Sequence, residues 1–138
     1  MTVVDPLEMV RSFHVAFDLP RRDVPQAAAP DERALRQSLI REEFEEFVRA
    51  SEADDLVGVA DALADLLYVV YGAAVTYGID IRPVFAEVHR SNMAKVGGRK
   101  NAVGKLLKPE GWQPPQLEPI LRAQGWEGDG AGAPRPTA

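Results

Sequence analysis

The chain has 138 residues, of which 46% are hydrophobic and 27% charged, with a formal net charge of -5. This is the composition of one soluble globular domain, and the acidic balance argues against a nucleic-acid partner, which needs a broad basic surface. Without cysteine the chain can form no disulfide framework, thiolate zinc site or cysteine nucleophile. The N-terminus lacks a basic leader with an apolar core, and no uncharged stretch reaches bilayer length. We therefore expect a cytoplasmic protein that binds no membrane.

Three helices are expected in the first 78 residues. A short one fits residues 5–18. Residues 31–51 contain no Gly or Pro, and their apolar side chains recur at helical spacing, with Asp31 as a plausible N-cap. A third helix begins at Asp54 or Asp55, runs to residue 77 and ends at Gly78, which suits a left-handed C-terminal residue.

Two more helices follow. One fits residues 83–96, because Asp80 can cap it, Pro83 falls in its first turn and Gly97 can end it. The other fits residues 116–124. No segment alternates with period two over strand length.

The predicted fold is therefore all-α, a bundle of about four to five helices. We expect a single domain over residues 1–126 and a disordered tail over residues 127–138. The stretch 97–115 is expected to be an ordered or semi-ordered basic loop.

The third helix carries the sharpest functional signal. Between residues 56 and 78 its only charged side chains are Asp61 and Asp65, which lie one turn apart on one face. Tyr68 and Gly72 continue that stripe. A helix that is apolar all round is normally buried, and a buried carboxylate is costly unless it is paired or bound to a metal. The two aspartates therefore require a partner.

The second helix contains a run of carboxylates that point in different directions. Helical projection places Glu43 and Glu46 over the apolar stripe, Glu42 at its margin and Glu45 on the outer side. If this stripe packs against Asp61 and Asp65, mutual repulsion demands a cation. Carboxylates without Cys or paired His suit Mg²⁺, for which Mn²⁺ can substitute. The alternative is a solvated acidic face with hydrogen-bonded aspartates.

A basic segment follows the acidic helices. Residues 89–108 contain six Lys or Arg side chains and no Asp or Glu. Asn92 and Lys95 can present an amide and an ammonium group on one side of the fourth helix. An acidic metal site with basic donors is what a triphosphate requires. The alternative is a solvated loop that balances the acidic surface, and His14 and His89 are expected to be structural.

Together these motifs resemble the MazG-like all-α nucleoside triphosphate pyrophosphohydrolases, relatives of phosphoribosyl-ATP pyrophosphohydrolase and of dimeric dUTPases. The motif EExxE is matched by residues 42–46, and the motif ExxD on the next helix is matched by residues 62–65 only at Asp65. Residues 65–69, 84–95 and 104–109 are most similar to the dUTPase-like branch.

The resemblance implies metal ligation by Glu43, Glu46 and Asp65, with Glu42 activating water or holding a second ion. Glu43 is also a candidate catalytic residue. The Glu expected at position 62 is Ala62. Asp61 is the nearest acid and is expected to serve as an alternative ligand. The other outcome is a site that keeps one tight ion, held by Glu43, Glu46 and Asp65, and loses a second.

The resemblance also implies contacts with the substrate and its phosphates. The candidate residues are Asn92 and Lys95 at the end of the fourth helix, Arg99, Lys105 and Lys108 in the basic loop, and Tyr68 on the third helix. It further implies a homodimer or homotetramer whose interfaces bury the long helices.

The expected activity is Mg²⁺-dependent hydrolysis of a (deoxy)nucleoside triphosphate to the monophosphate and pyrophosphate, with dUTP or another pyrimidine or non-canonical nucleotide as substrate. A ferritin-like di-iron bundle is disfavoured because the chain has no Glu-x-x-His pair. A non-catalytic helical dimer that binds a nucleotide or a protein partner through a degenerate metal site remains the alternative, and Ala62 is its best support.

Overall fold

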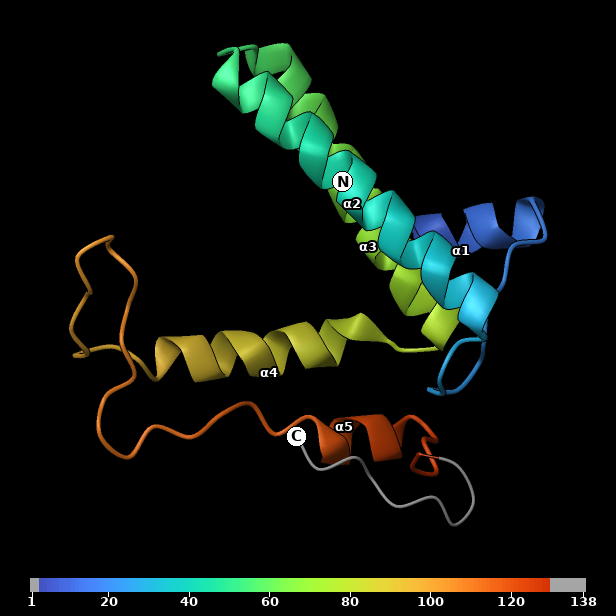
Figure 1. Ribbon diagram of the computed structural model, residues 1–138. Coiled ribbons are helices and arrows are strands. Elements are labelled where there is room, and N and C mark those ends of the chain that lie inside the picture. The colour runs from blue at the N-terminus through green and yellow to red at the C-terminus, as the bar shows by residue number, and fades with distance from the viewer. Residues whose placement is uncertain (1–2, 130–138) are drawn as a thin grey trace.

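The computed structural model describes residues 3–129. Within that range it contains five helices and no strand, which confirms the all-α prediction (Figure 1). The helices are α1 (Pro6–Ala16), α2 (Pro30–Glu52), α3 (Leu56–Tyr77), α4 (Ile81–Met93) and α5 (Glu118–Ala123). Residues 130–138 of the predicted tail lie outside the described residues.

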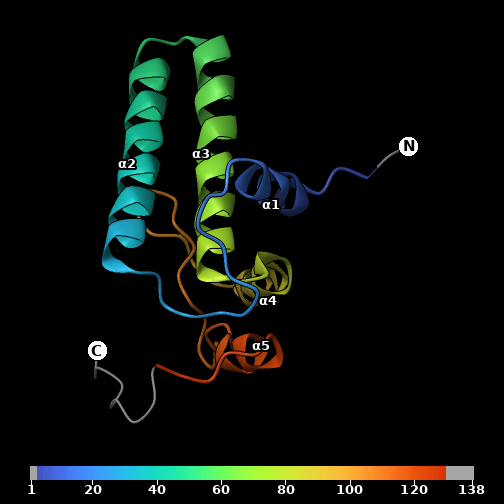
Figure 2. The same cartoon turned by 90° about the vertical axis from the view of Figure 1, so that its right-hand side faces the viewer.

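Helices α2 and α3 form a long antiparallel hairpin, seen side by side in Figure 2. The turn between them spans only residues 53–55, and Asp55 caps α3, its carboxylate accepting the Gly58 N–H at 3.1 Å. At the other end of α2 the predicted cap Asp31 is wrong. The Glu32 side chain reaches back to accept the Ala29 N–H at 2.7 Å, and it also binds Arg22. Glu32 caps the helix in place of Asp31, because its carboxylate accepts the free Ala29 N–H and also pairs with the Arg22 guanidinium.

The buried core lies where α1 packs on the C-terminal part of α3. Leu7, Val10, Ala74 and Val75 form it. His14 is buried beside them, and its Nδ1 lies 3.0 Å from the Pro20 carbonyl, so this histidine is structural, as expected. Burial lowers the pKa of its imidazole.

The chain reverses after α3 and leaves the hairpin. Gly78 adopts the left-handed conformation predicted for it, with φ of 72°, and Asp80 caps α4 as predicted. Helix α4 ends at Met93, three residues before the predicted end. Residues 112–124 then run back along α4, and the Gln124 side chain bonds both the N–H and the carbonyl of Asp80, at 2.9 Å each. Figure 1 shows α4 and α5 side by side, apart from the long hairpin.

Much of α3 is exposed in the single chain, although its sequence predicts a buried helix. Leu56 is 79% exposed, and Phe85 on α4 is 73% exposed. Further exposed apolar side chains on α3 are Val57, Leu63, Leu67, Tyr68 and Val70. Of the described helices, α3 alone has the length and hydropathy to cross a membrane. One chain therefore leaves a broad apolar surface uncovered.

Candidate active site

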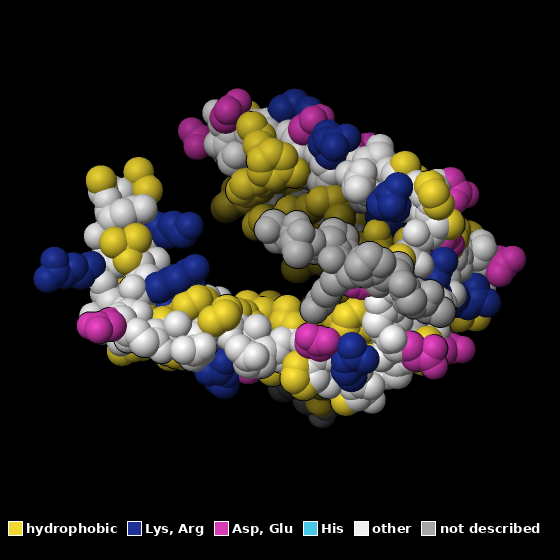
Figure 3. All heavy atoms as spheres, turned by 60° about the horizontal axis from the view of Figure 1, so that its bottom comes forward, with side chains coloured by type: hydrophobic (Ala, Val, Ile, Leu, Met, Phe, Trp, Pro, Cys, Tyr) yellow, Lys and Arg dark blue, Asp and Glu magenta, His cyan; other side chains and the backbone are white. Residues whose placement is uncertain are grey.

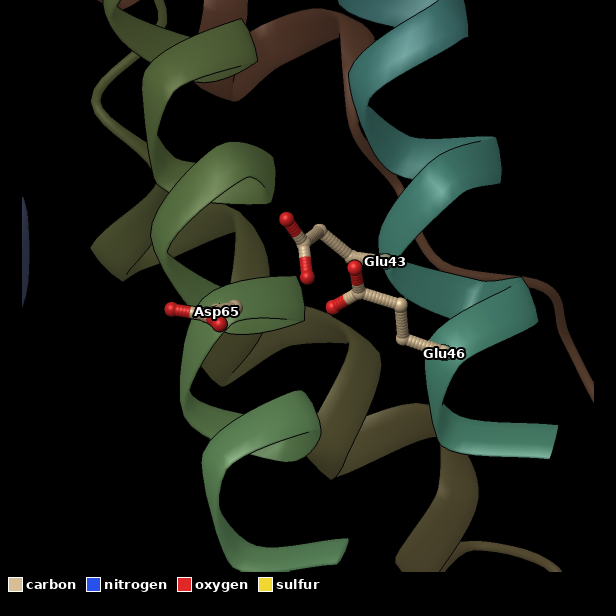
Figure 4. Close-up of side chains that lie close together, drawn as sticks. All are labelled: Glu43, Glu46 and Asp65. Carbon is tan, nitrogen blue, oxygen red and sulfur yellow. The ribbon is translucent and has the colours of Figure 1, made fainter. Parts of the chain in front are cut away.

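Three carboxylates converge between α2 and α3. Glu43 and Glu46 extend from successive turns of α2 toward α3, which carries Asp65 (Figure 4). One oxygen of each lies within 4.8 Å of the others, and all three side chains are partly buried. Their spacing of three residues on α2 places both glutamates on the side that faces α3. The predicted convergence is therefore present for Glu43, Glu46 and Asp65, whereas Asp61 and Glu42 lie outside this cluster.

The site is strongly electronegative. Burial, followed by the neighbouring carboxyls of Glu46 and Asp65, raises the pKa of Glu43 to about 7. Burial and the charges of Asp61 and Glu46 raise the pKa of Asp65 as well. Across residues 3–129 no Lys or Arg forms an ion pair with these acids. The charges therefore repel one another without internal compensation.

The donor set fits a hard divalent cation. The Glu43 Oε2 atom is fully buried and has no hydrogen-bond partner among the described residues. A buried carboxylate oxygen without a partner is costly, and a cation relieves that cost. All three ligand candidates are carboxylates, which suit Mg²⁺, Mn²⁺ or Ca²⁺ better than softer metals.

The other acidic candidates lie around this cluster. Glu42 is exposed, but its charge contributes to the raised pKa of Glu43. Asp61 is also exposed, one turn before Asp65. Glu45 is exposed, as expected for the outer side of α2. Ala62 is only 2% exposed, so the position where the family motif has Glu lies on the buried side of α3.

The basic segment forms a small ordered loop after α4. The Leu107 N–H donates to the Arg99 carbonyl at 2.6 Å, and the Asn101 N–H donates to the Lys105 carbonyl at 2.8 Å. Gly98 permits this closure, because a Cβ there would meet the Leu107 carbonyl. Arg99, Lys105 and Lys108 are exposed on this loop. The predicted pair at the end of α4 also meets, with Lys95 Nζ donating to Asn92 Oδ1 at 3.0 Å.

The acidic cluster and the basic loop do not come together within one chain. Figure 1 shows the loop at the far end of α4, across a gap from the α2–α3 hairpin. In Figure 3 the arm on the left carries Lys and Arg side chains beside this open space. Tyr68 lies on α3, edge-on to the Phe13 ring at 5.5 Å.

Sequence reasoning missed Trp112. Its ring lies close to the ammonium groups of both Lys95 and Lys108. The signal was present, because Trp112 is one of only two tryptophans and follows the basic segment closely. The spacing alone could not show that the chain turns back onto α4 at this point.

Comparison with known proteins identifies the family of this chain. A family model described as phosphoribosyl-ATP pyrophosphohydrolase matches residues 10–92. The chain belongs to the phosphoribosyl-ATP pyrophosphohydrolase family. An uncharacterized protein of Acanthamoeba polyphaga mimivirus is 37% identical over 78 residues, which cover 54% of this chain. The match spans 31% of the viral protein, so this chain corresponds to less than a third of that relative.

The matched region of this pyrophosphohydrolase family member contains the whole acidic cluster and Asn92. Lys95 and the basic loop, which includes Trp112, lie beyond it. The carboxylate cluster therefore lies within the part of the chain that the family model matches, whereas the function of the loop has to be argued from its own geometry.

Proposed function

We propose that this protein hydrolyses a (deoxy)nucleoside triphosphate between its α- and β-phosphates, in a Mg²⁺-dependent reaction that yields the monophosphate and pyrophosphate. The observation that carries the proposal is the convergence of Glu43, Glu46 and Asp65 in a chain of the pyrophosphohydrolase family. A repulsive carboxylate cluster is costly to maintain without a cation, and phosphate chemistry needs that cation.

Glu43, Glu46 and Asp65 would hold the ion. When bound, such an ion polarises phosphoryl oxygens and acidifies water. Glu42 lies beside the cluster at the margin of α2 and is our candidate to accept a proton from the attacking water. Asp61 supplies negative charge from one turn away and is our candidate for the ligand that Ala62 does not provide.

The favoured substrate is dUTP or another pyrimidine or non-canonical nucleotide. This choice is supported by the similarity of residues 65–69, 84–95 and 104–109 to the dUTPase-like branch. Tyr68 offers a partly exposed ring one turn after Asp65, which can contact the substrate. The leaving phosphates would be contacted by Asn92, Lys95, Arg99, Lys105 and Lys108.

A second copy of the chain is the proposed partner, in a homodimer or homotetramer. The exposed apolar side chains of α3 support this assembly. Lipid is a poor alternative, since each aspartate at the centre of a bilayer costs roughly 2.5 to 3.5 kcal/mol and α3 carries Asp61 and Asp65. We therefore favour a cytoplasmic protein.

We further propose that the basic loop serving one acidic cluster comes from another copy, because the two stand apart in a single chain. Mixing an Asp65→Asn protein with a Lys95→Ala protein, at a nucleotide concentration well below the KM of the Lys95→Ala variant, tests this arrangement. Shared sites would restore activity above that of either variant alone, through mixed oligomers with one intact site. Activity no greater than the sum of the separate variants would contradict it.

The proposed reaction is tested by measuring pyrophosphate release across a panel of ribo- and deoxynucleotides, with Mg²⁺ and with a chelator. The expected result is Mg²⁺-dependent release, greatest for a pyrimidine nucleotide. Binding without hydrolysis of any nucleotide would favour the non-catalytic helical dimer, whose supporting feature is Ala62.

A further inference from the structure

Two lysines share one aromatic ring at the end of α4. The Lys95 Nζ lies 5.2 Å from the centroid of the Trp112 ring, and the Lys108 Nζ lies 4.9 Å from it. Both distances are within the range of a cation–π contact. Lys95 lies just after the end of α4 and Lys108 lies within the basic loop, so the ring connects the end of α4 to the loop.

The ring itself is held in place. The Trp112 Nε1–H donates to the Ser91 carbonyl at 2.7 Å. Ser91 is buried, and its hydroxyl donates to the Gln113 carbonyl at 3.4 Å. The Gln116 N–H donates to the Glu87 carboxylate at 2.7 Å, which ties the same segment to α4. Trp112 is therefore a fixed platform rather than a mobile surface side chain.

The two ammonium groups lack a neutralising carboxylate. Within the described chain, neither Lys95 nor Lys108 forms an ion pair. Lys95 also donates to the neutral Asn92 amide, which leaves its charge intact. Two cations held near one ring repel each other unless an anion binds both. A compact group with several negative oxygens satisfies that requirement best.

We propose that Trp112 positions Lys95 and Lys108 as a clamp for a diphosphate group. The group can belong to a nucleotide or to free pyrophosphate, and its role in catalysis rests on the proposed function. Trp112 is a positioning residue, because it acts on the anion through the lysines. A diphosphate offers one phosphoryl group to each ammonium group, whereas a single orthophosphate has only one phosphoryl group for both.

The binding test uses the protein's two tryptophans as reporters. The Trp126→Phe variant keeps Trp112 as its sole tryptophan, and titration with inorganic pyrophosphate should change its fluorescence saturably. Orthophosphate should bind roughly tenfold or more weakly, because it engages one ammonium group well rather than two. The reciprocal Trp112→Phe variant, which retains Trp126, should show no response. An unchanged Trp112 signal, or equal binding of orthophosphate and pyrophosphate, would overturn the proposal.

Kinetics separate positioning from a structural role. Trp112→Leu should raise KM for the nucleotide about five- to thirtyfold, through loss of two cation–π contacts, with kcat little changed. Trp112→Phe should recover most of this loss, because it keeps a ring. Trp126→Leu is a matched control, since it removes the Arg122 contact at 5.0 Å outside the proposed site. A wild-type KM in Trp112→Leu would contradict the clamp.

The two proposals can fail separately. If the protein hydrolyses no nucleotide, pyrophosphate titration still tests the clamp. If Trp112→Leu does not fold, the Lys95→Met and Lys108→Met double variant in the Trp126→Phe background replaces it. That variant should lose the pyrophosphate response, and an undiminished response would show that the lysines do not hold the anion.

Discussion

Glu43→Gln should have opposite effects on the stability of the metal-free and metal-bound protein. In the native state the pKa of Glu43 is raised from its ordinary value of 4.5 to about 7. This difference corresponds to roughly 3 kcal/mol of unfavourable interaction for the ionised form. Because the side chain is partly exposed, solvent screening reduces the effect, and we expect about 1 to 2 kcal/mol. The glutamine side chain of Glu43→Gln carries no charge, so the variant lacks the repulsion between this position and the neighbouring carboxylates.

The raised pKa of Glu43 determines how the stability difference between wild type and Glu43→Gln depends on pH. Native Glu43 keeps its proton up to about pH 7, whereas the unfolded chain loses it near pH 4.5. The stability linked to that proton is present below the lower value and is lost as the pH rises through the upper one. Without metal, Glu43→Gln should therefore be more stable than wild type at about pH 8, by about 1 to 2 kcal/mol. The difference should shrink as the pH falls toward 4.5.

With Mg²⁺ bound, the wild-type protein should be more stable than Glu43→Gln. At a free concentration of about 100 times Kd, binding stabilises the wild-type protein by roughly 2.7 kcal/mol. For a chain of this size that is a rise in Tm of roughly 10 °C. The variant lacks one charged ligand and should gain much less.

Urea unfolding and thermal melts, at low and high pH and with Mg²⁺ or chelator, measure these differences. Glu45→Gln is the matched control, because it removes the same charge from the exposed side of α2 and should change neither the pH dependence nor the Mg²⁺ effect. The reasoning is refuted if metal-free Glu43→Gln is less stable than wild type at about pH 8, or if Mg²⁺ stabilises both proteins equally.

Four further predictions concern activity and the loop. Glu46→Gln and Asp65→Asn should each lower kcat by about 100-fold or more, because each removes a charge from the ion's ligands, whereas an equal loss in Glu45→Gln would contradict the cluster. Asp61→Asn should impair kcat nearly as much as Asp65→Asn, and Ala62→Glu should give no large gain; a fully active Asp61→Asn enzyme would reject Asp61 as a ligand. Lys95→Ala should raise KM for the triphosphate with the helical circular dichroism unchanged, and a wild-type KM would make the loop a solvated surface. Gly98→Ala should also raise KM, because its Cβ would meet the Leu107 and Lys95 carbonyls and open the loop, and an unaltered KM would show that closure is not needed.

The sequence predicted the parts of the fold that depend on local spacing. Glu43, Glu46 and Asp65 converge because helical periodicity fixes which faces of α2 and α3 they occupy. The caps at Asp80 and Gly78 were predicted from residue type, because Asp side chains cap helix N-termini and Gly adopts the left-handed conformation at C-termini. The cap of α2 was not, since Glu32 reaches back to Ala29 and pairs with Arg22, a choice that depends on how the linker folds.

The missed features depend on contacts between distant residues. The direction in which α4 leaves the hairpin separates the basic loop from the acidic cluster, and sequence spacing does not encode that direction. The return of residues 112–116 onto α4 brings Trp112 to Lys95, which a loop assignment cannot show. Ala62 could be recognised as a departure from the motif, but only the fold shows that this position is buried.

The most direct test of the central claim is to follow nucleotide hydrolysis in ¹⁸O-labelled water by ³¹P NMR, with Mg²⁺, for wild type and Asp65→Asn. Attack of water at the α-phosphorus predicts the monophosphate and pyrophosphate in equal amounts, with the label only in the monophosphate, and near-complete loss of both products in Asp65→Asn. Label in pyrophosphate, release of orthophosphate, or a rate unaffected by Asp65→Asn or by removal of Mg²⁺ would contradict the account.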